Sequence, residues 1–139
     1  PLITEPRIIN DIKYLDGGIT CSIPIQRVLD LGYDRVVVVL TRKKGSYSKT
    51  TKTQGLLMSK MYEDYPNFVK ACKDRTALYK RQVEQCEKLE VEGKVLIIRP
   101  TIKEVSRLEN DNDELTMAYY HGYTKTRLLR KRIKDFLKD

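Results

Sequence analysis

The sequence has few of the residues on which several common kinds of site depend. It contains no tryptophan, two phenylalanines and one histidine in 139 residues. With one histidine and no CxxC pair, the sequence does not predict a zinc site with ordinary cysteine and histidine ligands. No apolar run approaches the roughly 20 residues that a membrane-spanning helix needs. We therefore expect no metal site and no transmembrane segment.

Cysteine is also scarce, with only Cys21, Cys72 and Cys86 present. Cys72 and Cys86 fall in one expected helix, where a rise of 1.5 Å per residue separates them by roughly 21 Å, whereas a disulfide needs alpha carbons within about 7 Å. We expect three reduced thiols, which are typical of the cytoplasm. The chain starts at Pro1 without an initiator methionine or a signal peptide, so we expect its true start to be missing and the protein to be cytoplasmic or peripheral at a membrane.

Positive charge is concentrated in two parts of the chain. Lys and Arg number 27 against 19 Asp and Glu, a net charge of +8, and segments 42–53 and 123–139 each carry +5. Such segments attract anions, including lipid headgroups and nucleic acid. The chain has no recognition motif and little aromatic surface for base stacking, so we do not expect a nucleic-acid partner.

Short apolar runs separated by helical patterns predict an α/β fold. Val36–Leu40 and Val95–Ile98 are apolar runs without alternation, typical of parallel strands covered on both faces. Helices are expected between them at Gly55–Tyr65 and Pro66–Glu92. The longer helix carries an apolar stripe that we interpret as core, formed by Phe68, Cys72, Tyr79, Val83, Cys86 and Leu89.

The N-terminal part predicts a hairpin followed by a short helix. Asn10-Asp11 tolerates the positive φ of a tight turn, which places a hairpin at Ile8–Leu15. A helix over Pro24–Leu31 then stops at Gly32. The span from Tyr14 to Thr41 therefore reads as a strand–helix–strand unit of an α/β layer.

The C-terminal region, about 101–139, is predicted to be mainly helical. One turn is expected at Glu104–Glu109, and Asp111 with Glu114 forms a capping box for a helix through Tyr119. A separate last helix is expected to have one apolar side, formed by Leu129, Ile133, Phe136 and Leu137, and basic residues around the rest. This helix is either interfacial at a membrane or an ordinary surface helix.

The first basic segment follows the carboxyl end of the Val36–Leu40 strand, the edge at which open α/β sheets bind ligands. A phosphate or lipid headgroup could be held there by Arg42, Lys43, Lys44 and Lys49. The alternative is a solvated loop with no ligand.

The most specific element is YLDGGITCSIPI at residues 14–25. Asp16 follows an expected strand and precedes Gly17 and Gly18, so its carboxylate lies where the backbone turns sharply and a substrate can approach closely. The alternative is a turn without chemistry, since Asp-Gly is a common turn signal.

Together with LGYDRVVVVLTR, the basic loop and KVLIIRP, this element resembles the C-terminal half of bacterial patatin-like phospholipases over nearly all of the chain. The resemblance implies a partial three-layer α/β/α domain at 1–139, with a mostly parallel sheet and without the half that carries the nucleophile. It also implies a Ser-Asp dyad without histidine or cofactor, in which Asp16 matches the acid and Gly17 and Gly18 its DGG motif. Cys21 departs from the acid that many relatives have there.

A serine hydroxyl becomes a useful nucleophile when a base accepts its proton, and Asp16 could be that base. No serine of the chain stands in a GxSxG context; they are Ser22, Ser46, Ser48, Ser59 and Ser106. We expect the chain alone to be inactive, and a longer parent to cleave fatty-acyl esters of lipids. The unpaired strands of the 139-residue chain predict either self-association or a rearrangement of the Ile8–Leu15 hairpin that covers them. The rival hypotheses are a non-catalytic module on anionic membranes and a domain that binds a phosphorylated ligand at 42–52.

Overall fold

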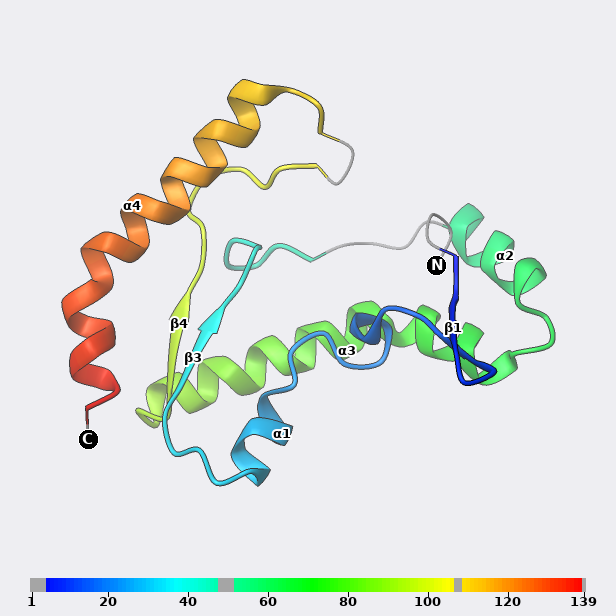
Figure 1. Ribbon diagram of the computed structural model, residues 1–139, viewed down its shortest axis with the longest axis horizontal. Helices are drawn as coiled ribbons and strands as arrows, with labels where there is room; N and C mark the ends of the chain where they lie inside the picture. Colours follow the sequence, from blue (N-terminus) through cyan, green and yellow to red (C-terminus); the bar gives the residue numbers. More distant parts are fainter. Residues whose placement is uncertain (1–4, 48–51, 107–108, 139) are drawn as a thin grey trace. The chain divides into compact units, whose positions relative to one another are not determined.

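The computed structural model describes residues 5–47, 52–106 and 109–138, and the chain divides into two compact units (Figure 1). The first unit comprises Pro1–Ile25 and Ser48–Glu84, and the second comprises Gln26–Tyr47 and Gln85–Asp139. The protein is mixed α/β, as predicted. Its elements in chain order are β1 (Arg7–Ile9), β2 (Ile12–Tyr14), the 3-10 helix η1 (Gly17–Ile19), α1 (Ile25–Asp30), β3 (Val36–Val39), α2 (Lys52–Met61), α3 (Pro66–Val91), β4 (Val95–Ile98) and α4 (Asn112–Phe136).

The predicted N-terminal hairpin is confirmed. β1 and β2 are antiparallel, with Arg7 opposite Tyr14 and Ile9 opposite Ile12. Asn10 and Asp11 have φ values of 50° and 61°. Two consecutive residues with positive φ match the right-handed twist of the strands, and Asn and Asp tolerate this conformation better than most residues.

The two apolar segments that were predicted to form parallel strands do pair in parallel. β3 and β4 lie side by side in Figure 1, in a register that aligns Val36 with Val95 and Val39 with Ile98. The expected strand–helix–strand unit is wrong in one respect: β2 pairs with β1, in a sheet separate from that of β3. The tight Asn10-Asp11 turn satisfies β2 locally, so it contributes nothing to the parallel pair.

Burial differs between the two parallel strands. On β4, Val95 and Leu96 are both buried although successive side chains point to opposite faces, so both faces are covered. On β3, Val38 is buried while Val39 is 70% exposed. The expectation that both strands are covered on both faces therefore holds for β4 and is wrong for β3.

α3 is a single 26-residue helix. Its predicted apolar stripe is confirmed, since Val83, Cys86 and Leu89 are buried. The helix ends where Gly93 adopts φ +76°, which lets the amides of Gly93 and Lys94 turn back to the carbonyls of Glu90 and Leu89. Only three residues, Glu92, Gly93 and Lys94, separate the end of α3 from the start of β4.

The shorter helices fall near their predicted positions. α1 occupies Ile25–Asp30 and is followed by Gly32 at φ +86°, which confirms the predicted stop. α2 begins and ends earlier than the predicted Gly55–Tyr65, because a turn in which Tyr65 N–H donates to the Tyr62 carbonyl separates it from α3.

α4 is one helix of 25 residues, whereas two were predicted. Its N-terminus is capped as expected, since the Asp111 carboxylate accepts the amides of Asp113 and Glu114. Gly122 lies in the middle without interrupting the helix. The turn predicted at Glu104–Glu109 includes residues 107–108, which lie outside the described residues, although Glu109 N–H does donate to the Ser106 carbonyl.

Each unit has its own small core. The first contains Ile19, Ile23, Ile25, Met58, Val69 and Val83, and the second contains Val38, Leu40, Cys86, Leu89, Val95, Leu96 and Ile98. The predicted free thiols are confirmed for Cys21, Cys72 and Cys86. Within the described ranges, no helix is both long enough and apolar enough to cross a bilayer.

Candidate functional site

Asp16 occupies a defined position at the start of η1, two residues after β2 ends. It is the N-cap of this single 3-10 turn, and its Oδ1 accepts the Gly18 amide at 2.8 Å. Its backbone carbonyl accepts the Ile19 amide at 3.1 Å. The bond from the Gly18 amide holds the Asp16 carboxylate in place. Because the residue is exposed, solvent can still reach this carboxylate.

The two glycines of the DGG element have different roles. A Cβ at Gly18 would lie 3.1 Å from Asp16 Oδ1, whereas a Cβ at Gly17 would meet nothing within 4 Å. Neither glycine is among the residues with positive φ. Gly18 is therefore required for the close approach of the carboxylate to the backbone, and not for an unusual backbone conformation.

The loop after Asp16 is tied to α3 by polar side chains. Arg75 Nε and Ser22 Oγ both donate to the Gly18 carbonyl, at 3.0 and 2.7 Å. Gln82 accepts the Ile23 amide at 3.1 Å and donates from Nε2 to Cys21 Sγ at 3.3 Å. With Ile19 buried beneath it, the turn that carries Asp16 is anchored on both sides of Gly18.

Arg75 and Gln82 are site residues that the sequence analysis missed. They stand seven residues apart, two turns of helix, among the apolar positions of the α3 stripe. A long polar side chain in such a stripe commonly has a partner, because burying an unpaired polar group is costly. That signal could have identified both residues as anchors for a loop, although not which loop.

The Asp16 turn can accept a proton but holds no nucleophile of its own. Ser22 is the serine nearest in sequence, and its hydroxyl donates to the Gly18 carbonyl. In the described part of the chain, no group of three or more His, Cys, Asp or Glu side chains could hold a metal ion. General acid–base chemistry at a carboxylate is therefore the chemistry that these residues offer.

The three described candidates for anion binding, Arg42, Lys43 and Lys44, have different surroundings. Arg42 Nη1 forms a 2.9 Å ion pair with Glu104 Oε2, and both side chains are largely shielded from solvent. Lys43 and Lys44 are exposed in a turn closed by a hydrogen bond from Ser46 N–H to the Lys43 carbonyl. Lys49 lies outside the described residues. An anion here would meet Lys43 and Lys44, because Glu104 already neutralises Arg42.

A cavity of about 400 Å³ lies at the carboxyl ends of β3 and β4, against the middle of α4. Its wall includes Leu40, Ile98 and His121. His121, the single histidine of the chain, accepts the Thr101 amide at Nε2 over 3.2 Å. This ring therefore holds the loop after β4 against α4, as a packing residue would.

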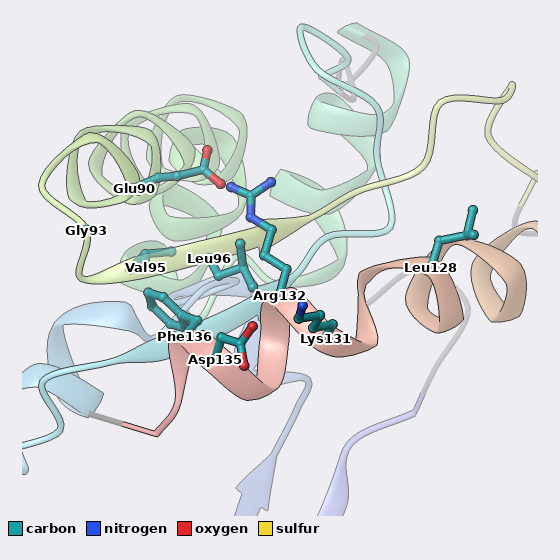
Figure 2. Close-up of a pocket in the computed structure, with 9 residues that line it drawn as sticks. All are labelled: Glu90, Gly93, Val95, Leu96, Leu128, Lys131, Arg132, Asp135 and Phe136. Carbon is teal, nitrogen blue, oxygen red and sulfur yellow. The ribbon is translucent and has the colours of Figure 1, made fainter.

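A second cavity, of about 620 Å³, lies between the end of α3, β4 and the last turns of α4 (Figure 2). Figure 2 shows Phe136 beside Val95 and Leu96, while Arg132 extends from α4 in the direction of Glu90. The cavity floor is apolar and its rim carries charges of both signs. It brings together no pair of groups suited to nucleophilic or acid–base chemistry.

Comparison with known proteins gives one match. The model of a family described as Domain of unknown function (DUF6363) matches residues 65–138, which include α3, β4 and α4. No curated protein and no solved structure matches the chain. The matched region begins after the DGG element and contains its anchors Arg75 and Gln82.

Proposed function

The chain belongs to the DUF6363 family, and from the turn that precedes the matched region we propose that it supplies the acid of a serine acyl hydrolase acting on fatty-acyl esters. Asp16 is the general base of this proposal. The observation that carries it is the 2.8 Å hydrogen bond from the Gly18 amide to Asp16 Oδ1, which fixes an exposed carboxylate in one orientation. The likeness of the DGG element to that of patatin-like phospholipases supports the same assignment.

The proposed reaction divides into acylation and deacylation. The serine oxygen attacks the ester carbonyl while Asp16 accepts the hydroxyl proton, and the resulting tetrahedral oxyanion collapses with loss of the alcohol, which takes that proton. Water then attacks the acyl-serine with its proton passing to Asp16, and the second tetrahedral oxyanion collapses to the fatty acid as the serine oxygen leaves and takes that proton back from Asp16. The oxyanion requires backbone N–H donors that this proposal places beside the serine.

The serine of this proposal lies outside the 139 residues, in a GxSxG turn of a longer protein. The pairing of β3 and β4 supports such an extension, because parallel strands normally occur in larger sheets with both faces covered. The three-layer α/β/α arrangement would place further strands beside β3 and a helical layer over the face on which Val39 is 70% exposed. In that arrangement the DGG turn and the serine turn would face each other.

The test compares two isosteric changes in the protein that contains both halves. Asp16→Asn keeps an oxygen that can accept the Gly18 amide but removes the base, so ester hydrolysis should fall by roughly 10²- to 10⁴-fold. Asp34→Asn changes an equally exposed acid in the loop before β3 and should leave the rate unchanged. An Asp16→Asn enzyme with near wild-type turnover would overturn the assignment.

A companion test uses the 139-residue chain itself. A fluorophosphonate that labels activated serines should not label it, because Ser22 is held by the Gly18 carbonyl. Stoichiometric labelling would mean that the chain contains its own nucleophile, and would contradict the division of the site that we propose.

A further inference from the structure

The outward side of α4 carries an ordered row of tyrosine and basic side chains. We call it the tyrosine–arginine face and define it by Tyr119, Tyr120, Tyr123, Arg127, Arg130 and Lys134. From Tyr120 onward the steps along the row are three or four residues, and Tyr119 stands four residues before Tyr123, so these positions share one side of the helix. All six residues are exposed, and the three tyrosines retain 66, 60 and 56% of their accessible surface.

The opposite side of α4 faces its own unit, which fixes the rotation of the helix. Leu129 and Phe136 are partly buried there, and α4 packs against β4. Arg35 Nη1 donates to the Phe136 carbonyl at 2.9 Å, and its guanidinium carbon lies 5.8 Å from the centre of the Phe136 ring. These contacts hold the C-terminal end of the helix, so the tyrosine–arginine face points away from its unit.

The charge of this face is of one sign. No acidic residue occupies the row between Tyr119 and Lys134, and Asp135 lies beside it on the helix. Among the ion pairs of the described residues, none involves Arg127, Arg130 or Lys134. The tyrosines contact one another, with ring centres 5.4 Å apart for Tyr119 and Tyr120 and 6.4 Å for Tyr119 and Tyr123.

We propose that the tyrosine–arginine face docks on the surface of a bilayer that contains anionic lipid, with α4 lying parallel to the membrane plane. Tyrosine rings favour the boundary between headgroups and acyl chains, since one end is apolar and the other is hydrated. Arginine and lysine beside them attract anionic headgroups. The 25 residues of α4 form a rod roughly 37 Å long, which suits a flat surface.

The choice of a lipid surface over nucleic acid rests on shape and on the proposed function. Single-stranded nucleic acid is generally bound in a basic groove where bases stack on aromatic side chains. The hollow on this face is lined by residues of α4 alone, so no second element closes a groove around a strand. A hydrolase of fatty-acyl esters also needs access to substrates that reside in membranes. The inference therefore deepens the proposed function, but vesicle binding requires no catalysis and can be measured separately.

The experiment measures co-sedimentation of the chain with phosphatidylcholine vesicles, with and without phosphatidylserine. Wild-type protein should bind the anionic vesicles, and added salt should release it. Combining Arg127→Gln, Arg130→Gln and Lys134→Gln should weaken binding at least 10-fold, since each basic residue near an anionic surface adds to the attraction. The second variant, Tyr119→Ser with Tyr123→Ser, should weaken binding to the same vesicles at every salt concentration.

Matched controls separate the face from the overall charge. Lys70→Gln, Lys73→Gln and Lys88→Gln remove the same charge from exposed positions of α3, and should leave most of the binding. Tyr33→Ser removes an exposed tyrosine before β3 and should have no effect. Equal losses in the two triple variants would overturn the docking face, and far-UV circular dichroism identifies any variant that has unfolded.

Further outcomes distinguish the docking face from a nucleic-acid site and from the proposed function. Salt-sensitive binding of an oligonucleotide that exceeds vesicle binding, and is lost in the α4 triple variant, would reassign the face to nucleic acid and overturn the proposal. Asp16→Asn should not change vesicle binding. The docking face alone would be refuted if the complete protein hydrolysed a water-soluble ester but did not bind vesicles through α4. The proposed function alone would be refuted if the protein bound vesicles but showed no hydrolysis that depends on Asp16.

Discussion

The backbone amide of Ile97 donates a 2.9 Å hydrogen bond to Oε1 of Glu90 in α3. The carbonyls of Lys94 and Ile98 accept the amides of Val36 and Leu40, so the backbone groups of these two residues point towards β3. Alternate residues of a strand point their backbone groups to opposite edges, and the Ile97 amide therefore points to the other edge of β4. Glu90 therefore satisfies a donor on an edge that has no strand neighbour among the described residues. Together with a 2.9 Å ion pair between Glu87 and Arg99, it ties the last turns of α3 to the parallel sheet.

Removing the Glu90 carboxylate should destabilise the protein. Glu90→Ala leaves the partly buried Ile97 amide without its acceptor, which costs about 1–3 kcal/mol of the free energy of unfolding in urea denaturation. Glu84→Ala is the control, because its 3.8 Å pair with Lys80 is exposed and should contribute less than about 1 kcal/mol. Equal losses in the two variants would contradict the role assigned to Glu90.

The two glycines of the DGG element should respond differently to alanine. Gly18→Ala places a methyl group 3.1 Å from Asp16 Oδ1 and should displace the carboxylate, while Gly17→Ala has open space. In the complete hydrolase, we expect the first change to lower kcat by roughly 10-fold or more, because catalytic groups tolerate little misplacement. The second should have almost no effect, and thermal unfolding should be similar for both. Similar kcat losses would refute the steric argument.

Stability should decrease at alkaline pH through Cys86. Burial raises the pKa of this thiol above its ordinary value of 9.0, and its side chain is fully buried. Above that ordinary value the unfolded chain loses the proton while the folded chain keeps it, so the free energy of unfolding falls as the pH rises. Urea denaturation at about pH 7 and about pH 9.5 should show a smaller decrease for Cys86→Ala than for the wild type. An identical decrease would exclude Cys86 as the cause.

The chain should self-associate through β3. This strand has one strand neighbour in the described structure, so another chain can pair with its other edge. Val39 is 70% exposed on one face of the strand and adds apolar surface to such a contact. Sedimentation velocity at micromolar concentration should reveal concentration-dependent oligomers, and Val39→Lys should shift them towards the monomer. A wild-type chain that sediments as a monomer at all concentrations would contradict this prediction.

Local patterns predicted the features that depend on neighbours in the chain. The Asn10-Asp11 turn, the Asp111 cap and the stripe through Val83 and Cys86 all follow from residues a few positions apart, and the structure confirms them. The parallel pairing of Val36–Val39 with Val95–Ile98 was also predictable, because unbroken apolar runs are typical of such strands.

Features that depend on distant residues could not be predicted. The ion pair between Arg42 and Glu104 joins residues 62 apart, and the bond from Arg75 to Gly18 joins residues 57 apart. No short-range pattern distinguishes these partners from exposed charges. The division of α4 into two helices was wrong for a related reason: α4 packs against β4, and tertiary packing of this kind supports a continuous helix in a way that its local sequence does not reveal.

The connection at Gly93 limits how the chain can change in length during evolution. Glu92, Gly93 and Lys94 alone join α3 to β4, and all three donate their amides to carbonyls at the end of α3. One inserted residue would shift every β4 position relative to Glu87 and Glu90 and exchange the side chains on its two faces. Insertions and deletions in related sequences should therefore be absent from this connection, and a non-glycine residue at position 93 should be restricted to Asn or Asp.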